Sequence, residues 1–290
     1  MSESVKIVEC PRDAWQGLPS LIPAQRKADY LQRLVASGFT AIDAVSFVSP
    51  SAVPQMADSE LVLQLIDVAD NLEIIGIVVN EIGAERAIKT GTVQTLGFPY
   101  SISPEFLRRN QKQTQEESLR VLGAITALAK SAERDVVAYI SMAFGNPYGE
   151  ACSIDVVVEA CRRLIEIGVR QISLSDTVGL ATPAQIEETV TCALEACDGA
   201  EIGVHLHARP QDAALKVRSA YRAGCRRFDA AIGGLGGCPF AQDALVGNIA
   251  TETLIAELNR LGARLSQLQP LDELVSASAA IAMDFGTAPR

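Results

Sequence analysis

The chain has 290 residues, a formal net charge of −10, 48% hydrophobic residues and 21% charged residues, a composition typical of a globular protein with a large core. The negative charge argues against nucleic acid as a partner, because proteins that bind nucleic acid present a basic surface. No apolar run reaches the roughly 18 residues of a membrane-spanning helix, and the N-terminal Met-Ser-Glu-Ser-Val-Lys lacks the basic and apolar regions of a signal peptide.

Short apolar segments rich in β-branched residues alternate with amphipathic segments along the chain. The first kind predicts strands at residues 5–10, 40–47, 72–79, 92–98, 135–142, 171–176, 201–207 and 227–232. The second kind predicts helices at residues 24–36, 61–69, 117–130, 154–167, 183–197 and 211–223, with closing helices at 251–261 and 271–283.

This alternation predicts a single-domain α/β protein: a (β/α)8 TIM barrel over about residues 4–262, with additional C-terminal helices at 263–290. The alternative is a doubly wound open sheet, which usually has a Gly-rich turn after its first strand. Here Pro11-Arg12-Asp13 follows that strand instead. Functional residues of such barrels lie at the carboxyl ends of the strands. Most polar residues that interrupt the apolar pattern lie at these carboxyl ends, which favours an enzyme over a scaffold.

The only two histidines stand one residue apart in Val204-His205-Leu206-His207 and therefore point to the same side of a strand. With Asp13 and Asn248 they offer one carboxylate, two imidazoles and one amide oxygen. This set suits a divalent ion, Mg²⁺ or Mn²⁺, better than structural zinc, which prefers a closed shell with thiolates. The alternative is a buried, hydrogen-bonded pair of histidines without a ligand.

Basic and aromatic residues near the predicted barrel mouth suggest substrate contacts. Arg12 is a fixed cation suited to stabilising an oxyanion, or it only holds the mouth together by pairing with Asp13 or Asp43. The basic run at residues 108–112 is a candidate for phosphate groups, or it is a solvated surface. Trp15, close to Asp13 in sequence, is expected to form a wall of the substrate pocket.

The Gly-rich segment Gly233-Gly234-Leu235-Gly236-Gly237-Cys238-Pro239 carries a thiol at its tip. Glycine permits backbone conformations closed to other residues, so this loop is suited to closing over a site, with Cys238 as a proton donor or acceptor. A tight turn with an incidental cysteine is the alternative. The seven cysteines are scattered and mostly lie in apolar segments, as free thiols do in a reducing compartment. We therefore expect a cytoplasmic protein.

Several strings of residues occur in a fixed order over nearly the whole chain. Among them are Pro11-Arg12-Asp13, Ser46-Phe47-Val48-Ser49-Pro50, Ser175-Asp176-Thr177-Val178-Gly179, His205-Leu206-His207, Gly234-Leu235-Gly236-Gly237-Cys238-Pro239 and Gly247-Asn248-Ile249-Ala250-Thr251-Glu252. Together they resemble the 3-hydroxy-3-methylglutaryl-CoA lyase family, within the metal-dependent aldol and Claisen barrel enzymes. The resemblance implies a (β/α)8 barrel that cleaves a 3-hydroxyacyl-CoA, with acetyl-CoA and acetoacetate as the products of the parent reaction.

Carried over residue by residue, the resemblance also implies roles for individual side chains. The implied metal ligands are Asp13, His205, His207 and Asn248. The implied catalytic residues are Arg12, Asp43, Asp176, His205 and Cys238. Arg12 would offset charge on the enolate oxygen, Cys238 would protonate the enolate carbon, and His205 and Asp176 are candidates for moving the hydroxyl proton. Candidates for binding the acyl group or CoA are Gln16, Ser46, Asn80, Arg108, Arg109, Asn110, Ser141 and Ser175.

The chain departs from the family pattern around the predicted mouth. Asp43 stands for a glutamate, Val137 for an arginine, Ala208 for an aspartate and Trp15 for a leucine. Because polar groups are lost, preference for a different 3-hydroxyacyl-CoA is one alternative to the parent activity. A Claisen-type synthase of the same superfamily and a non-catalytic barrel homologue are the others. The expected partner is a small acyl-CoA molecule, and a homo-oligomer is compatible with the sequence.

Overall fold

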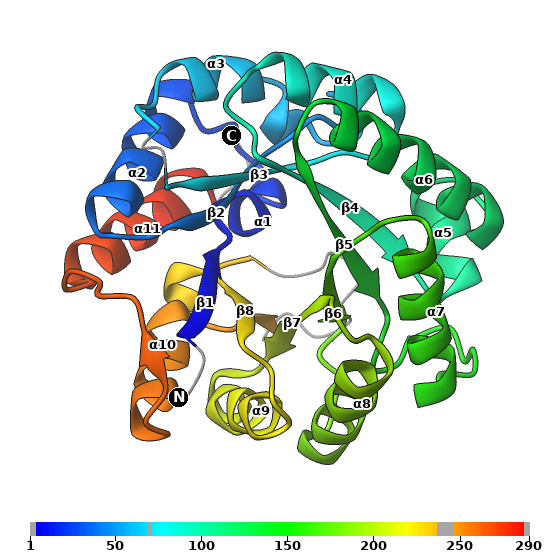
Figure 1. Cartoon of the computed structure of the whole chain (residues 1–290). Helices are drawn as coiled ribbons and strands as arrows, with labels where there is room; N and C mark the ends of the chain where they lie inside the picture. The colour runs from blue at the N-terminus through cyan, green and yellow to red at the C-terminus, as the bar shows by residue number, and fades with distance from the viewer. Residues whose placement is uncertain (1–3, 69–70, 237–245, 287–290) are drawn as a thin grey trace.

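In the computed structural model, which describes residues 4–68, 71–236 and 246–286, eight parallel strands form a closed barrel with helices around it (Figure 1). The barrel strands are β1 (Ser4–Glu9), β2 (Ala41–Ser46), β3 (Glu73–Ile77), β4 (Thr95–Ser101), β5 (Asp135–Ser141), β6 (Gln171–Asp176), β7 (Glu201–Ala208) and β8 (Arg227–Ala230). Pairing of β8 with β1, from Lys6 opposite Arg227 to Glu9 opposite Ala230, closes the barrel. The predicted (β/α)8 fold is confirmed.

Helices follow the barrel strands, and most of them lie in a ring around the barrel (Figure 1). They are α1 (Pro11–Gln16), α2 (Ala24–Ala36), α3 (Ser59–Gln64), α4 (Glu81–Lys89), α5 (Pro104–Asn110), α6 (Gln115–Ser131), α7 (Ile154–Glu166), α8 (Pro183–Ala196), α9 (Pro210–Arg222), α10 (Thr251–Arg260) and α11 (Asp272–Phe285). Two 3₁₀ turns, η1 (Pro54–Met56) and η2 (Ile232–Gly234), and two short strands, β9 (Gly247–Asn248) and β10 (Arg264–Leu265), complete the described elements. No helix in the described ranges is both long and apolar enough to span a membrane.

Local sequence explains where the elements begin and end. Helices α6 and α8 each start with a capping box, in which Thr114 pairs with Glu117 and Thr182 with Gln185. Strand β4 continues through Pro99, past the predicted end at residue 98. Proline is tolerated at this position because β3 pairs with β4 only as far as Gly97. The missing N–H of proline therefore breaks no bond to β3.

Three short helices, α1, α4 and α5, were not predicted, because their 6, 9 and 7 residues are too few to show a clear helical period. The helix predicted over residues 61–69 is shorter: α3 starts earlier and ends at Gln64. The position of α1 matters most for function, since it places Arg12 and Asp13 on a helix that starts directly after β1. Pro11 at its first turn favours that start.

Apolar side chains on the two faces of the strands form two separate cores. Alternating strand residues such as Ile74, Leu96 and Ile172 face the outer helices and belong to the large core. Val8, Cys10, Ala41, Ile75, Ile77, Val137 and Tyr139 form a smaller cluster inside the barrel. This interior is apolar only in part, because β8 also brings two fully buried charged side chains into it, Arg227 and Asp229.

Candidate active site

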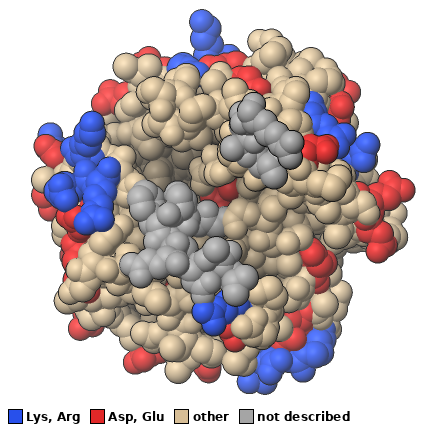
Figure 2. Space-filling view, turned by 180° about the vertical axis from the view of Figure 1, so that it is seen from behind, with Lys and Arg blue, Asp and Glu red and all other residues tan. Residues whose placement is uncertain are grey.

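A cavity of about 410 Å³ opens where the carboxyl ends of the strands meet. Its wall includes many of the residues predicted from the sequence: Arg12, Asp13, Gln16, Ser46, Asn110, Ser141, Ser175, His205 and His207. Apolar side chains such as Val53, Ile77, Phe106 and Tyr139 complete it. In Figure 2 one face of the molecule is hollowed near its centre, and Lys and Arg gather in separate groups around the edge of that face. The cavity is therefore a mixed polar and apolar pocket at the functional end of the barrel.

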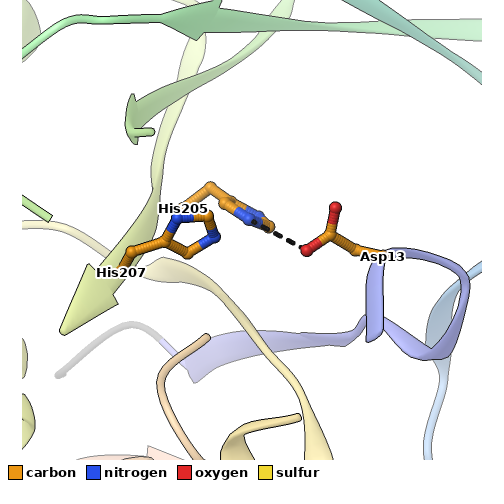
Figure 3. Close-up of side chains that lie close together, drawn as sticks. All are labelled: Asp13, His205 and His207. Atoms are coloured by element: carbon orange, nitrogen blue, oxygen red, sulfur yellow. Dashed lines mark ion pairs between the residues drawn. The ribbon is translucent and has the colours of Figure 1, made fainter. Parts of the chain in front are cut away.

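Asp13, His205 and His207 point toward one another in the cavity (Figure 3). One ligand atom from each side chain lies within 4.8 Å of the others, and all three side chains are buried. Nε2 of His205 lies 3.9 Å from Oδ2 of Asp13. The carboxylate comes from α1 and both imidazoles come from β7, so the barrel fold itself assembles the group.

Hydrogen bonding around His207 leaves one of its ring nitrogens free for a ligand. Nδ1 lies 2.9 Å from the carbonyl oxygen of Thr177, and since a carbonyl only accepts hydrogen bonds, Nδ1 carries the hydrogen. Nε2 then keeps its lone pair, and it is buried without a hydrogen-bond partner among the described residues. A divalent metal would satisfy this atom, so the donor set fits such an ion.

The charges of Asp13 and His207 also suit metal binding. Burial alone would raise the pKa of Asp13, but the guanidinium of Arg12 and the nearby histidines outweigh it and lower the pKa to about 2. Burial, together with the neighbouring His205, lowers the pKa of His207. Asp13 is therefore a carboxylate and His207 a neutral imidazole, the protonation states that a metal requires of its ligands.

Asn248 lies next to this group because β9 pairs with the end of β7, with His207 opposite Asn248. Its Nδ2 donates to Oδ2 of Asp13 (2.8 Å) and to the carbonyl oxygen of Leu235 (2.9 Å). These two bonds leave the amide oxygen available as a further ligand atom. The structure thus places all four predicted ligands side by side.

Arg12 is fixed by a two-point ion pair with Asp43. Nε lies 3.1 Å from Oδ1 of Asp43 and Nη2 lies 2.5 Å from Oδ2, while Nη1 donates to Gln16 (3.0 Å) and to Asp13 (3.3 Å). The pairing proposed as an alternative role for Arg12 is present, yet Arg12 also lines the cavity. Asp43 is 1% exposed and does not line it. Its position suits holding the guanidinium rather than touching substrate.

Some residues predicted for the site lie away from the cavity wall. The Asn80 side chain accepts a hydrogen bond from the backbone N–H of Gly83 and caps α4. The side chains of Arg108 and Arg109 are 69% and 53% exposed and pair with Glu105 on the same helix. The phosphate contacts expected of these arginines are thus not prearranged at the cavity.

Asp176 also lies behind the cavity wall, where it is 2% exposed. Its Oδ2 lies 2.6 Å from Nζ of Lys216, and its carboxylate accepts a hydrogen bond from the backbone N–H of Ala181. This ion pair leaves Asp176 unsuited to the predicted proton transfer. The position predicted for the general acid, Cys238, lies outside the described residues.

Comparison with known proteins assigns the chain to a family. The family model described as HMGL-like matches residues 5–281. The chain belongs to the HMGL-like family. It is 35% identical to the mitochondrial hydroxymethylglutaryl-CoA lyase of Mus musculus over 263 residues, which cover 90% of this chain and 80% of that protein. It is 32% identical to the hydroxymethylglutaryl-CoA lyase YngG of Bacillus subtilis over 268 residues, 92% of this chain and 88% of that protein.

A solved structure similar to this chain has the same fold. It is an HMG-CoA lyase from Acinetobacter baumannii in complex with coenzyme A and 3-methylmalate. Its structure matches with a TM-score of 0.89 and 31% identity, covering 99% of this chain and 93% of that chain. The order of motifs noted in the sequence thus reflects a relationship over the whole barrel.

The positions that the sequence analysis identified as departures from the family pattern lie away from the cavity wall. Trp15 is 1% exposed and packs edge-on against Tyr30, with ring centroids 5.4 Å apart, so the prediction that it forms a wall of the pocket is wrong. Val137 is buried inside the barrel, and Ala208 is 5% exposed at the end of β7. None of these three residues lines the cavity.

Sequence reasoning missed several residues that shape this site of the HMGL-like chain. Tyr139 lines the cavity, while Lys216 and Asp229 lie behind it. A signal for Tyr139 existed, because it stands two residues before Ser141 and so points to the same side of β5. Lys216 gave no such signal, because its partner Asp176 is distant in sequence. Arg227 and Asp229, two residues apart on one strand, could have been predicted to share a face.

Proposed function

We propose that this protein is a metal-dependent carbon–carbon lyase that cleaves 3-hydroxy-3-methylglutaryl-CoA into acetyl-CoA and acetoacetate. The observation that carries the proposal is the convergence of Asp13, His205 and His207 beside Arg12 in one cavity. Relatives named hydroxymethylglutaryl-CoA lyase match most of the chain. Coenzyme A and 3-methylmalate in the A. baumannii structure support an acyl-CoA substrate with a branched hydroxy acid.

The proposed ion is Mg²⁺ or Mn²⁺, held by Asp13, His205, His207 and Asn248. Oxygen and imidazole donors without a thiolate among them favour these ions over structural zinc. When bound, the ion supplies a Lewis acid that lowers the pKa of the substrate hydroxyl. Asp13 stays ionised at neutral pH, because its pKa is about 2.

Arg12 provides the second charge that the reaction needs. Breaking the C2–C3 bond places negative charge on the thioester oxygen, and a cation fixed beforehand stabilises that charge most effectively. The two-point bond to Asp43 fixes the guanidinium while Arg12 remains in the cavity wall. Asp43, one methylene shorter than the glutamate of the family pattern, still reaches both nitrogens.

The two roles predicted for His205 compete for the same atom. Nε2 is the nitrogen that faces Asp13, whereas Nδ1 lies 3.5 Å from Oδ2 of Asp229, which does not line the cavity. We therefore assign His205 to the metal site alone.

Cys238 is the proposed acid that protonates the enolate carbon of the departing acetyl-CoA.

The parent substrate is favoured over other 3-hydroxyacyl thioesters, because the altered positions Trp15, Val137 and Ala208 do not line the cavity. Asn110 on α5 does line it, and Arg108 and Arg109 stand beside it on the same helix. A CoA molecule that extends out of the cavity along α5 would contact the guanidinium groups of both arginines. Their ion pairs with Glu105 would have to break first.

The test is cleavage of 3-hydroxy-3-methylglutaryl-CoA by the purified full-length protein, with acetyl-CoA and acetoacetate both quantified. We expect equal amounts of the two products in the presence of Mg²⁺ or Mn²⁺ and none after chelation. A panel of other 3-hydroxyacyl-CoA esters, and acetyl-CoA plus a keto acid, serves as comparison. Absence of cleavage with any of these ions would refute the proposal, and a better substrate in the panel would refute the assignment of the acyl group.

A further inference from the structure

A pair of charged side chains lies inside the barrel below the proposed metal site. Arg227 and Asp229 stand two residues apart on β8 and therefore point to the same side of the strand. Both side chains are fully buried, and Nη2 of Arg227 lies 3.4 Å from Oδ1 of Asp229. Burying one of these charges without the other would be very costly, so each stabilises the ionised form of the other.

The second oxygen of Asp229 connects this pair to the proposed metal site. Oδ2 accepts a hydrogen bond from Ser173 (2.8 Å) and lies 3.5 Å from Nδ1 of His205. On the other side of the same imidazole, Nε2 faces Asp13. His205 therefore lies between two carboxylates, one inside the barrel and one in the cavity.

Surrounding residues enclose the Arg227 side chain. It crosses β7 at Gly203, where a Cβ atom would lie only 2.9 Å from Cγ of Arg227, so this passage requires glycine. Nε lies 3.2 Å from Oε1 of Glu201, and Cζ lies 5.9 Å from the centre of the Tyr139 ring. The guanidinium thus lies at ion-pair distance from two carboxylates and makes no hydrogen bond within the described part of the chain, so its link to Asp229 is one of charge.

We propose that Asp229 is a positioning residue that orients His205 for metal binding, and that Arg227 keeps Asp229 in place. A carboxylate facing Nδ1 favours the tautomer with hydrogen on that nitrogen, which leaves the lone pair of Nε2 directed at Asp13. Carboxylates that hold metal-binding histidines in this way fix both the ring orientation and the tautomer. This inference rests on the proposed metal site.

The first test is the affinity of the full-length protein for Mn²⁺, measured by titration calorimetry. The main variant is R227M/D229A, which removes both buried charges together and so avoids leaving one of them unpaired. We expect ~10–100-fold weaker binding, the usual effect of losing the partner of a metal-binding histidine. The control is Arg218→Met, which breaks an ion pair with Glu257 between α9 and α10 (2.7 Å) and should leave Mn²⁺ affinity unchanged.

The second test reads the tautomer directly by nitrogen NMR of the metal-free protein. It is practical because the chain has only two histidines. We expect hydrogen on Nδ1 of His205 in the wild type and a shift toward Nε2 in R227M/D229A. His207 should not change, since Thr177 holds its Nδ1.

Unchanged Mn²⁺ affinity together with an unchanged His205 tautomer in a folded R227M/D229A variant would overturn the inference. Failure of the wild type itself to bind either Mn²⁺ or Mg²⁺ would instead refute the proposed metal site. The His205 tautomer would then be the only test of the positioning role of Asp229. A shift of the hydrogen toward Nε2 in R227M/D229A would support that role, and no shift would overturn it.

Discussion

Nζ of Lys216 lies 2.6 Å from Oδ2 of Asp176, and both side chains are buried. Lys216 also donates to the carbonyl oxygens of His207 (2.8 Å) and Gly179 (3.1 Å). One ammonium group from α9 therefore ties the end of β6 to the end of β7, where the proposed metal ligands lie. Asp176, predicted to be catalytic, thus lies behind the cavity wall in an ion pair beside the proposed ligands.

The first prediction concerns this ion pair. Lys216→Met leaves the Asp176 carboxylate buried without its partner and should lower the free energy of unfolding by ~3–5 kcal/mol. The double variant K216M/D176N removes both charges and should recover part of the loss. Urea denaturation of both variants and of Asp176→Asn alone gives the coupling between the residues. Strictly additive effects would contradict a direct interaction.

The second prediction separates the two roles of Arg12. Lysine keeps the charge but cannot bind both oxygens of Asp43. Arg12→Lys should lower kcat by ~10²–10³, as expected when a group that stabilises the transition state is displaced. The free energy of unfolding should fall by only ~1–3 kcal/mol, because one oxygen of Asp43 loses its partner. Arg26→Lys on α2, where the side chain is 41% exposed, is the control and should affect neither quantity. Near-normal turnover of Arg12→Lys would leave Arg12 with a structural role only.

The position of the site could be predicted from the sequence because the barrel fixes it. Side chains at the carboxyl ends of parallel strands meet at one mouth whatever their distance in sequence, which is how Asp13 and His205 come together. Arg12 and Asp13 were expected at the end of a strand and lie on α1 instead. This difference changes the position of the two side chains little, because α1 begins directly after β1.

The direction of individual side chains was harder to predict. Ser175 lines the cavity while its neighbour Asp176 does not, because consecutive strand residues point to opposite faces. Trp15 follows Asp13 by two residues on α1, a rotation of about 200° that turns it away from Asp13 and into the core. The ion pair of Lys216 with Asp176 depends on a contact between residues distant in sequence that no local pattern encodes. The spacing of Arg227 and Asp229 on β8, by contrast, places both on one face of the strand.

The third prediction is a pH dependence that originates at Glu9. Its carboxyl group is buried between β1 and the chain after β8, where it accepts hydrogen bonds from the backbone N–H of Ile232 (2.8 Å) and from the Thr251 hydroxyl. Burial raises its pKa from 4.5 to about 8. The folded state binds this proton more tightly than the unfolded chain. The contribution of Glu9 to the free energy of unfolding is therefore fully present below about pH 4.5 and is lost as the pH rises toward 8.

The variant that checks this assignment is Glu9→Gln, which has no proton to lose. Its free energy of unfolding, measured by denaturant titration between about pH 5 and 8, should decline less with rising pH than that of the wild type. Parallel declines in the two proteins would show that other groups cause the dependence.

The fourth prediction concerns metal removal. An ion that binds only the folded state should stabilise it by about 2.7 kcal/mol at a free concentration of 100 times Kd. Thermal unfolding of the wild type should therefore occur at a lower temperature after chelation than with Mn²⁺. His207→Ala should lose this difference, whereas the control Cys152→Ser, at an exposed thiol, should retain it. A metal-dependent shift that persists in His207→Ala would place the ion elsewhere.

The last prediction concerns the proposed acid. Cys238→Ser should keep the fold and the metal-dependent thermal shift, because the four proposed ligands are unchanged. Its turnover should fall by ~10²–10⁴, the usual contribution of general acid catalysis, since a hydroxyl is a far weaker acid than a thiol. Cys152→Ser again serves as the control and should cleave the thioester at the wild-type rate. Turnover of Cys238→Ser close to that of the wild type would assign protonation of the enolate carbon to another group, and the polar residues that line the cavity, Ser141 and Ser175 among them, would be the next to substitute.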